Sequence, residues 1–213
     1  MNSAIVSVPA LWELVILGYL LGSIPFGFLL VRGTTGRDIR AMGSGNIGAT
    51  NVARSAGPGI GIATLLLDAA KGYLAVWLIA HFSNGNIRFM MYAGLASILG
   101  HMFPVWLRFS GGKGVATTLG AFVGICWQAL GLAVAVFIIV FLFWRYVSLA
   151  SVSAAAALPL LVYLLYAPGH APPTAVSTGT LIAAILIIIK HRDNIERLIH
   201  GTEPRFGKDR EDS

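Results

Sequence analysis

Residues 8–31 read VPALWELVILGYLLGSIPFGFLLV, an apolar run in which Glu13 is the only charged side chain. At about 1.5 Å per residue, this run is long enough to cross the ~30 Å hydrocarbon core of a bilayer as one helix. No basic segment precedes the run, so we expect a retained span rather than a cleaved signal peptide. Pro25 and Gly27 predict a kink or a local weakening near its second end.

The composition of the whole chain agrees with a membrane protein. Of its 213 residues, 56% are hydrophobic and 11% are charged, and the mean hydropathy is +0.78. These values exclude a water-soluble domain. The single Cys126 lies in an apolar run and rules out a disulfide framework, no zinc pattern occurs, and neither a metal nor another cofactor is expected. The formal net charge is +6, but the basic residues flank apolar spans without aromatic platforms, so we expect anionic lipid and phosphate as partners and no nucleic acid.

Further apolar runs predict six more spans. Residues 114–144 carry no charge over a length too great for one ordinary span, and we expect a break near Gln128. The six spans are expected at residues 59–82, 89–107, 115–127, 129–144, 147–165 and 174–189, with a turn at 167–173. The predicted fold is therefore all-α: a polytopic integral membrane protein with seven transmembrane helices. Residues 1–213 are expected to form a single membrane-embedded domain with a basic tail at about 199–213.

The distribution of lysine and arginine predicts the orientation. With the amino terminus outside, thirteen of the fifteen basic residues face the cytoplasm, Lys71 lies within a span, and Arg88 is outside. The carboxyl terminus is then cytoplasmic. The polar loops described next and the tail face the same compartment, so their side chains can converge on one site.

Residues 43–51 read GSGNIGATN and lie between two apolar runs. Glycines allow positive φ and close approach of backbone N–H groups to an anion. Ser44 and the neighbouring amides and hydroxyls add donors, and Arg54 supplies a planar fork suited to phosphate oxygens. Taken alone, this pattern favours a turn at the membrane surface over a binding site.

Residues 110–118 read SGGKGVATT and repeat the combination of glycines, hydroxyls and one cation ahead of an apolar run. Two such loops in a small chain favour a phosphate site over two surface turns.

Several polar residues lie within or beside the spans. Asp68 and Lys71 are three residues apart on one helix face, which fits a structural ion pair or a substrate contact equally well. For His101, we favour a role in the site over a hydrogen bond to a neighbouring helix. If the last helix continues into the tail, His191, Asn194 and Leu198 share one face. Gly201 then ends the helix, and Glu203 can partner a basic group.

Four strings carry a resemblance to a known family: GSGNIGATN at 43–51, GHMFP at 100–104, GGKGVAT at 111–117 and HRDNIERL at 191–198. Together they resemble the bacterial acyl-phosphate-dependent glycerol-3-phosphate acyltransferase family of the PlsY type, over nearly the whole chain. The resemblance implies transfer of a fatty acyl group from acyl phosphate to the 1-hydroxyl of glycerol 3-phosphate. The products are lysophosphatidic acid and phosphate, in the first step of phospholipid synthesis, at the bacterial inner membrane with the active site facing the cytoplasm.

The resemblance and the residues together indicate the site. By similarity to this family, glycerol 3-phosphate is expected to contact Ser44, Arg54, Lys113, His191 and Asn194. The acyl phosphate is expected near Gly43, Gly45, Asn46, Gly48, Thr50, Asn51, Gly111, Gly112 and Gly114. The expected catalytic residues are Ser44, Lys113, His101 and Asn194.

The proton chemistry is expected to involve the substrate itself. Only His191 has a carboxylate five positions later, Glu196, and on a helix this offset separates the two side chains too far for an orienting hydrogen bond. An acyl phosphate is already reactive, so we hypothesise direct attack by the glycerol hydroxyl, with a phosphate oxygen as proton acceptor and His101 as the fallback base. The rival classes are a transporter for a phosphorylated solute, for which no internal repeat is found, and a scaffold, which leaves the two loops unexplained.

Overall fold

The computed structural model describes residues 7–166 and 172–207, and every regular element within them is a helix. The apolar helices are α1 (Val8–Ser23), α2 (Phe26–Thr35), α4 (Pro58–Phe82), α5 (Ile87–Met102), α6 (Val115–Ile125), α7 (Trp127–Trp144), α8 (Val147–Tyr166) and α9 (Thr174–Lys190). The shorter elements are α3 (Ala49–Ala56), α10 (Arg192–Ile199) and the 3₁₀ turns η1 (Ile39–Ala41) and η2 (Val105–Leu107). The all-α prediction is confirmed for this part of the chain. The predicted turn at 167–173 and the end of the basic tail lie largely outside the described residues.

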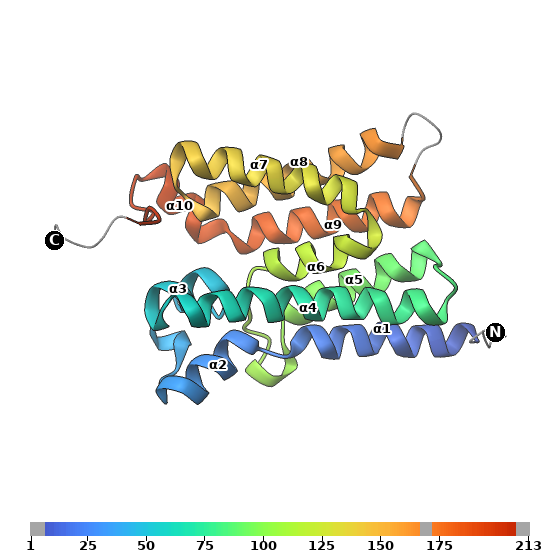
Figure 1. Ribbon diagram of the computed structural model, residues 1–213, viewed down its shortest axis with the longest axis horizontal. Coiled ribbons are helices and arrows are strands. Elements are labelled where there is room, and N and C mark those ends of the chain that lie inside the picture. The colour runs from blue at the N-terminus through green and yellow to red at the C-terminus, as the bar shows by residue number, and fades with distance from the viewer. Residues whose placement is uncertain (1–6, 167–171, 208–213) are drawn as a thin grey trace.

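The long helices form two groups that lie side by side (Figure 1). Helices α1, α4 and α5 pack together, α7 and α9 both pack on α8, and the short α6 lies between the groups against α4. Glycines allow the closest helix contacts: a Cβ on Gly22 would clash with the carbonyl of Ser97, and one on Gly120 with that of Ala69. Such small-residue contacts let helix backbones meet where the surrounding lipid supplies no hydrophobic driving force.

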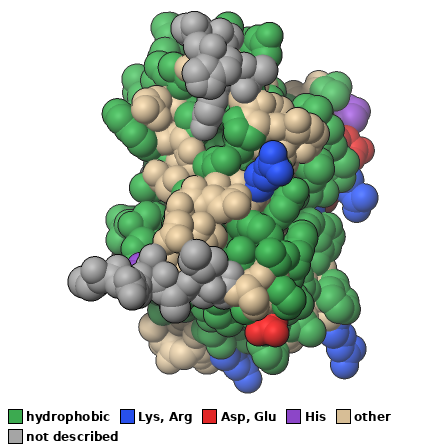
Figure 2. Space-filling view, turned by 90° about the vertical axis from the view of Figure 1, so that its right-hand side faces the viewer, with side chains coloured by type: hydrophobic (Ala, Val, Ile, Leu, Met, Phe, Trp, Pro, Cys, Tyr) green, Lys and Arg blue, Asp and Glu red, His purple; other side chains and the backbone are tan. Residues whose placement is uncertain are grey.

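The outer surface of the helices is strongly apolar. On α7, for example, Leu142 is 69% exposed and Phe143 is 77% exposed. Figure 2 shows the end of the molecule at which α1 begins, where hydrophobic side chains predominate and charged side chains are few. An exposed apolar surface of this extent suits contact with lipid tails.

The number of spans is only partly supported. Among the described residues, five helical segments are long and apolar enough to cross a membrane: Val8–Thr35, Pro58–Phe82, Ile87–Leu107, Trp127–Trp144 and Val147–Leu165. A sixth is obtained if α9 and α10, which are bent by 56° relative to each other, count together. The remaining apolar helix, α6, has 11 residues, or about 16 Å of helix. The count of seven transmembrane helices therefore stays a prediction.

The first apolar run is broken rather than simply kinked. Helix α1 ends at Ser23 and α2 begins at Phe26, because Pro25 has no N–H to donate and its ring restricts the preceding residue. The carbonyl of Ile24 at the break accepts a hydrogen bond of 2.8 Å from Lys71 Nζ on α4. The predicted weak point is thus confirmed, and a buried cation from another helix satisfies part of its backbone.

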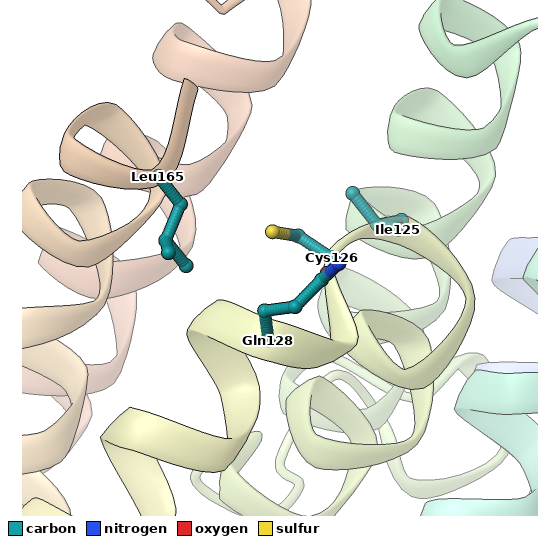
Figure 3. Close-up of a pocket in the computed structure, with 4 residues that line it drawn as sticks. All are labelled: Ile125, Cys126, Gln128 and Leu165. Carbon is teal, nitrogen blue, oxygen red and sulfur yellow. The ribbon is translucent and has the colours of Figure 1, made fainter. Parts of the chain in front are cut away.

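The break predicted near Gln128 occurs slightly earlier, at Cys126, where φ is −158° and α6 gives way to α7. Gln128 lies in the first turn of α7, and its side chain is exposed. The polar amide is therefore accommodated within the helix and does not cause the break. A hollow of about 210 Å³ lies at this junction, between Ile125, Cys126, Gln128 and Leu165 (Figure 3). It is at the opposite end of the bundle from α10, and therefore away from the polar loops.

Candidate active site

Asn51 organises the first glycine-rich segment. Its Oδ1 accepts a hydrogen bond of 2.9 Å from the N–H of Ser44, and its Nδ2 donates to the carbonyls of Met42 at 3.0 Å and Asn46 at 2.8 Å. Gly43 has φ +55°, and a Cβ at this position would clash with Asn51 Oδ1. The backbone of this segment is therefore held in one shape by its own asparagine.

The last residues of this segment are helical, although the sequence predicted a loop throughout. Thr50 and Asn51 already belong to α3, with Gly48 as the N-cap residue, and the N–H of Gly48 donates to Asn46 Oδ1 at 2.8 Å. Arg54 lies one turn further along α3, where its Nη2 donates to the carbonyl of Pro204 at 3.2 Å. A short helix therefore joins the first segment to the carboxyl-terminal part of the chain.

The second glycine-rich segment brings Lys113 to the same carboxyl-terminal part. Gly114 has φ +84° and precedes the first residue of α6. The preceding Lys113 donates from Nζ to Oδ1 of Asn194 on α10. Lys113 and Asn194 are 81 positions apart in the chain, so this contact depends on the packing of α6, α9 and α10.

Glu203 is the centre of the site's hydrogen-bond network. Its Oε1 accepts bonds from Asn194 Nδ2 at 2.7 Å and from Ser148 Oγ on α8 at 2.6 Å. Its Oε2 accepts a bond of 2.8 Å from Arg197 Nε on α10. Burial alone would raise the pKa of Glu203, but the hydrogen bonds from Ser148, Asn194 and Arg197 outweigh it and lower this pKa below its ordinary value.

The network confirms one expectation and adds residues that the sequence reasoning missed. Glu203 was expected to partner a basic group, and it pairs with Arg197. The sequence did not indicate a role for Ser148. A serine near Arg145 in a predicted cytoplasmic loop is common, and only the structure shows that it donates to Glu203. The condition of one continuous last helix through His191 is not met, because α9 ends at Lys190 and α10 starts at Arg192.

His191 and Asn194 are nonetheless both buried near the site. His191 is 3% exposed, and its Nδ1 lies 2.8 Å from the carbonyl of Ile187 in the last turn of α9. Glu196 is exposed on α10. His191 is therefore buried and Glu196 is exposed, which agrees with the prediction that residues five positions apart do not form an orienting hydrogen bond.

The remaining expected residues divide between the surface and the interior. Ser44 is exposed, and its backbone N–H ties it to α3. His101 is 3% exposed, and its carbonyl accepts a 3.0 Å hydrogen bond from the N–H of Gly112. Within the described residues, no group of three or more His, Cys, Asp or Glu side chains is placed to hold a metal ion.

The electrostatics of the site suit a phosphate dianion. Burial lowers the pKa of Lys113 to about 8; Glu203 opposes this decrease, and the nearby Arg197 and Arg54 add to it. Arg54, Lys113 and Arg197 thus lie within electrostatic reach of one another and of the carboxylate of Glu203. Three cations and the carboxylates of Glu203 and Asp193 leave an excess of positive charge for an anionic ligand.

This pKa predicts an alkaline limit to substrate capture. Because the pKa of Lys113 is lowered to about 8, its positive charge is present below that pH and is lost as the pH rises through it. The second pKa of a phosphate monoester is about 6, so the substrate does not change charge in this range. We expect kcat/KM for glycerol 3-phosphate to fall above about pH 8. The fall should be absent in Lys113→Ala, and an unchanged alkaline limb in that variant would contradict the assignment.

An apolar pocket of about 380 Å³ adjoins the first glycine-rich segment. It is lined by residues at the break of the first span and in η2: Ile24, Pro25, Phe28, Leu29, Trp106 and Leu107. Gly27, beside Phe28, lies directly against the carbonyl of Ile47 in the glycine-rich segment. Polar donors and an apolar hollow are therefore neighbours here.

The fold and the site define a class: a helical membrane protein whose glycine-rich segments and carboxyl-terminal helix converge on a cationic site. Residues 12–201 match the family described as Glycerol-3-phosphate acyltransferase, and the chain belongs to this family. The resemblance carried by the four sequence strings is thereby confirmed.

Individual relatives agree with this assignment. A glycerol-3-phosphate acyltransferase of Mesorhizobium japonicum is 50% identical over 193 residues, covering 90% of this chain and 94% of the relative. One of Geotalea daltonii is 49% identical and covers 91% and 96%. The crystal structure of PlsY (YgiH), an integral membrane glycerol 3-phosphate acyltransferase, in its glycerol 3-phosphate form has a TM-score of 0.84 at 43% identity, covering 93% of this chain and 96% of that one. Its lysophosphatidic acid form has a TM-score of 0.81 at 42% identity.

Proposed function

We propose that this acyltransferase moves a fatty acyl group from acyl phosphate to the 1-hydroxyl of glycerol 3-phosphate, giving lysophosphatidic acid and phosphate. The observation that carries the proposal is the convergence of Arg54, Lys113 and Asn194 around Glu203. Both proposed substrates carry phosphate groups, which need cations and N–H donors at the water interface. The solved relative named in its glycerol 3-phosphate and lysophosphatidic acid forms supports the acceptor and the product.

The proposed roles follow the geometry of the two glycine-rich segments. Arg54 and Lys113 bind the phosphate of glycerol 3-phosphate, while Ser44, His191 and Asn194 orient the molecule. The acyl phosphate lies along the first segment, at backbone N–H groups other than those of Ser44, Gly45 and Gly48, which already donate within the protein. The second segment's glycines lie beside it. These donors are held in place before substrate arrives, which favours electrostatic stabilisation of the charge that develops during acyl transfer.

The proposed chemistry is a direct transfer. The glycerol oxygen forms a bond to the acyl carbon, the bond from that carbon to the phosphate oxygen breaks, and the hydroxyl proton passes to a phosphate oxygen of a bound substrate. Because acyl phosphate is a mixed anhydride with a good leaving group, positioning and electrostatic stabilisation supply most of the acceleration. No covalent enzyme intermediate is required.

The acyl chain is proposed to enter the pocket between α2 and η2. The pocket is lined by apolar side chains and adjoins the segment proposed to bind the reactive phosphate, so the chain can stay in hydrocarbon while the carbonyl remains at the polar loops. An acyl phosphate with a photoreactive terminal group should label Leu29 or Trp106. Labelling of α7 or α9 instead would remove this pocket from the proposal.

The test of the reaction is direct. Purified protein is incubated with labelled glycerol 3-phosphate and either acyl phosphate or acyl-CoA. Lysophosphatidic acid is expected from acyl phosphate alone. Equal product from acyl-CoA would overturn the choice of donor, and an acyl-enzyme trapped on Ser44 would overturn direct transfer.

The proposal includes an inner-membrane location with the site in the cytoplasm. Thr34, at the end of α2, and Asn84, between α4 and α5, are exposed at opposite ends of the bundle. In a Cys126→Ala background, an impermeant thiol reagent applied outside intact cells should label Asn84→Cys and spare Thr34→Cys. The reverse pattern would invert the orientation, and external labelling of both variants would refute it.

A further inference from the structure

A buried charged cluster lies beneath the second glycine-rich segment, and the proposed chemistry does not use it. Asp68 and Lys71 on α4 are 2% and 4% exposed, and His101 on α5 is 3% exposed. Lys71 Nζ lies 2.8 Å from Asp68 Oδ1, which favours the ion-pair interpretation over a substrate contact. None of the hydrogen bonds or ion pairs of these three side chains joins them to Glu203 or Asn194.

The cluster connects two backbone irregularities. At one end, Lys71 donates to the carbonyl of Ile24, where the first span breaks. At the other, His101 Nδ1 faces Asp68 Oδ1 at 3.5 Å, and the His101 carbonyl accepts a hydrogen bond from Gly112. The histidine ring also abuts Gly112, because a Cβ added there would clash with Nε2.

Such a cluster is costly at membrane depth. Burying an ion pair gains less than packing apolar side chains of the same volume, and ionisable groups within membrane spans usually have a function. The particular contacts of His101 indicate what that function is. One edge of the ring faces a carboxylate held by Lys71, the other rests against the residue immediately before Lys113, and the backbone of His101 bonds that same residue.

We propose that Asp68 and His101 are positioning residues that hold the backbone at Gly112 so that Lys113 meets the phosphate of glycerol 3-phosphate. They act through Gly112 and touch neither substrate, which gives His101 a role different from that of a base. The inference rests on the proposed binding role of Lys113. It does not depend on the identity of the acyl donor.

The experiment measures binding of glycerol 3-phosphate to purified protein by calorimetry, without acyl donor. Asp68→Asn retains the shape of the side chain but removes the charge that faces His101. Asp68→Asn/Lys71→Met removes both charges together, so that no buried charge is left unpaired, although it also removes the hydrogen bond from Lys71 to Ile24. Ser97→Ala is the matched control, because Ser97 is fully buried on α5 one turn before His101 and its backbone lies against Gly22 of α1.

Misplacing Lys113 should weaken binding by about tenfold to a hundredfold in both cluster variants, while Ser97→Ala binds as wild type does. Because the cluster acts through Lys113, adding Asp68→Asn to Lys113→Ala should weaken binding by no more than about a further twofold. Wild-type affinity in Asp68→Asn/Lys71→Met, or full additivity with Lys113→Ala, would overturn the inference. Wild-type protein that binds glycerol 3-phosphate but makes no lipid from acyl phosphate would instead overturn the proposed reaction and leave this inference standing.

Discussion

Replacing Arg54 or Lys113 with alanine is expected to lower kcat/KM for glycerol 3-phosphate by about tenfold to a hundredfold. Each side chain is proposed to make a charge-assisted contact with the substrate phosphate, and such a contact is worth roughly 1.5–3 kcal/mol. Arg54 is tied to the carbonyl of Pro204, and Lys113 to Asn194, so both cations are held at the site before substrate binds. Steady-state kinetics with varied glycerol 3-phosphate measure the effect.

Two further variants separate charge from geometry at this site. Arg54→Lys should remain impaired, because a point charge does not reproduce the planar fork of a guanidinium. Arg37→Ala is the matched control, since Arg37 is exposed just beyond α2 and contributes the same charge away from the site. Near-normal kinetics in both Arg54→Ala and Lys113→Ala would remove these residues from substrate binding. An equal loss of kcat/KM in Arg37→Ala would show that the Arg54 and Lys113 variants act through the overall positive charge and not through a contact with substrate.

Replacing Glu203 with alanine is expected to destabilise the fold by about 2–4 kcal/mol. Glu203 is 7% exposed and accepts hydrogen bonds from Ser148, Asn194 and Arg197. Its removal leaves these donors without their acceptor and breaks the connection between α8 and α10. Unfolding in detergent micelles, followed by circular dichroism, measures the loss of stability.

Glu196→Ala serves as the control for the Glu203 variant. Glu196 is an exposed carboxylate on α10, so its loss should change stability by no more than about 0.5 kcal/mol. Glu203→Gln should lie between the two, because the amide oxygen still accepts hydrogen bonds but the charge opposite Arg197 is lost. If Glu203→Ala unfolds at the same temperature as Glu196→Ala, the carboxylate does not hold the carboxyl-terminal segment in place.

The amino-acid sequence alone determined the helical class, the positions of the apolar helices and the family. Hydropathy is a local property, so the predicted run at 59–82 differs from the observed α4, Pro58–Phe82, by a single residue. Pro25 likewise marks the break of the first span, because its missing N–H and fixed φ act on its own helix. The glycine, hydroxyl and basic residues of the two segments are also adjacent in the chain, and their chemistry was readable there.

Tertiary structure alone decided which of these groups meet. Ser148 and Glu203 are 55 positions apart, and Lys113 and Asn194 are 81 apart, so their contacts depend on how α6, α8 and α10 pack. The same holds for the His101 ring against Gly112 and for the choice between an ion pair and a substrate contact at Asp68. The helical spacing of residues in the tail also did not predict the bend at His191. Periodicity indicates which residues can share a helix face, but it does not indicate where the helix axis changes direction. Long-range hydrogen bonds and close backbone contacts form only between folded elements, and for this reason the sequence indicated the components of the site but not its arrangement.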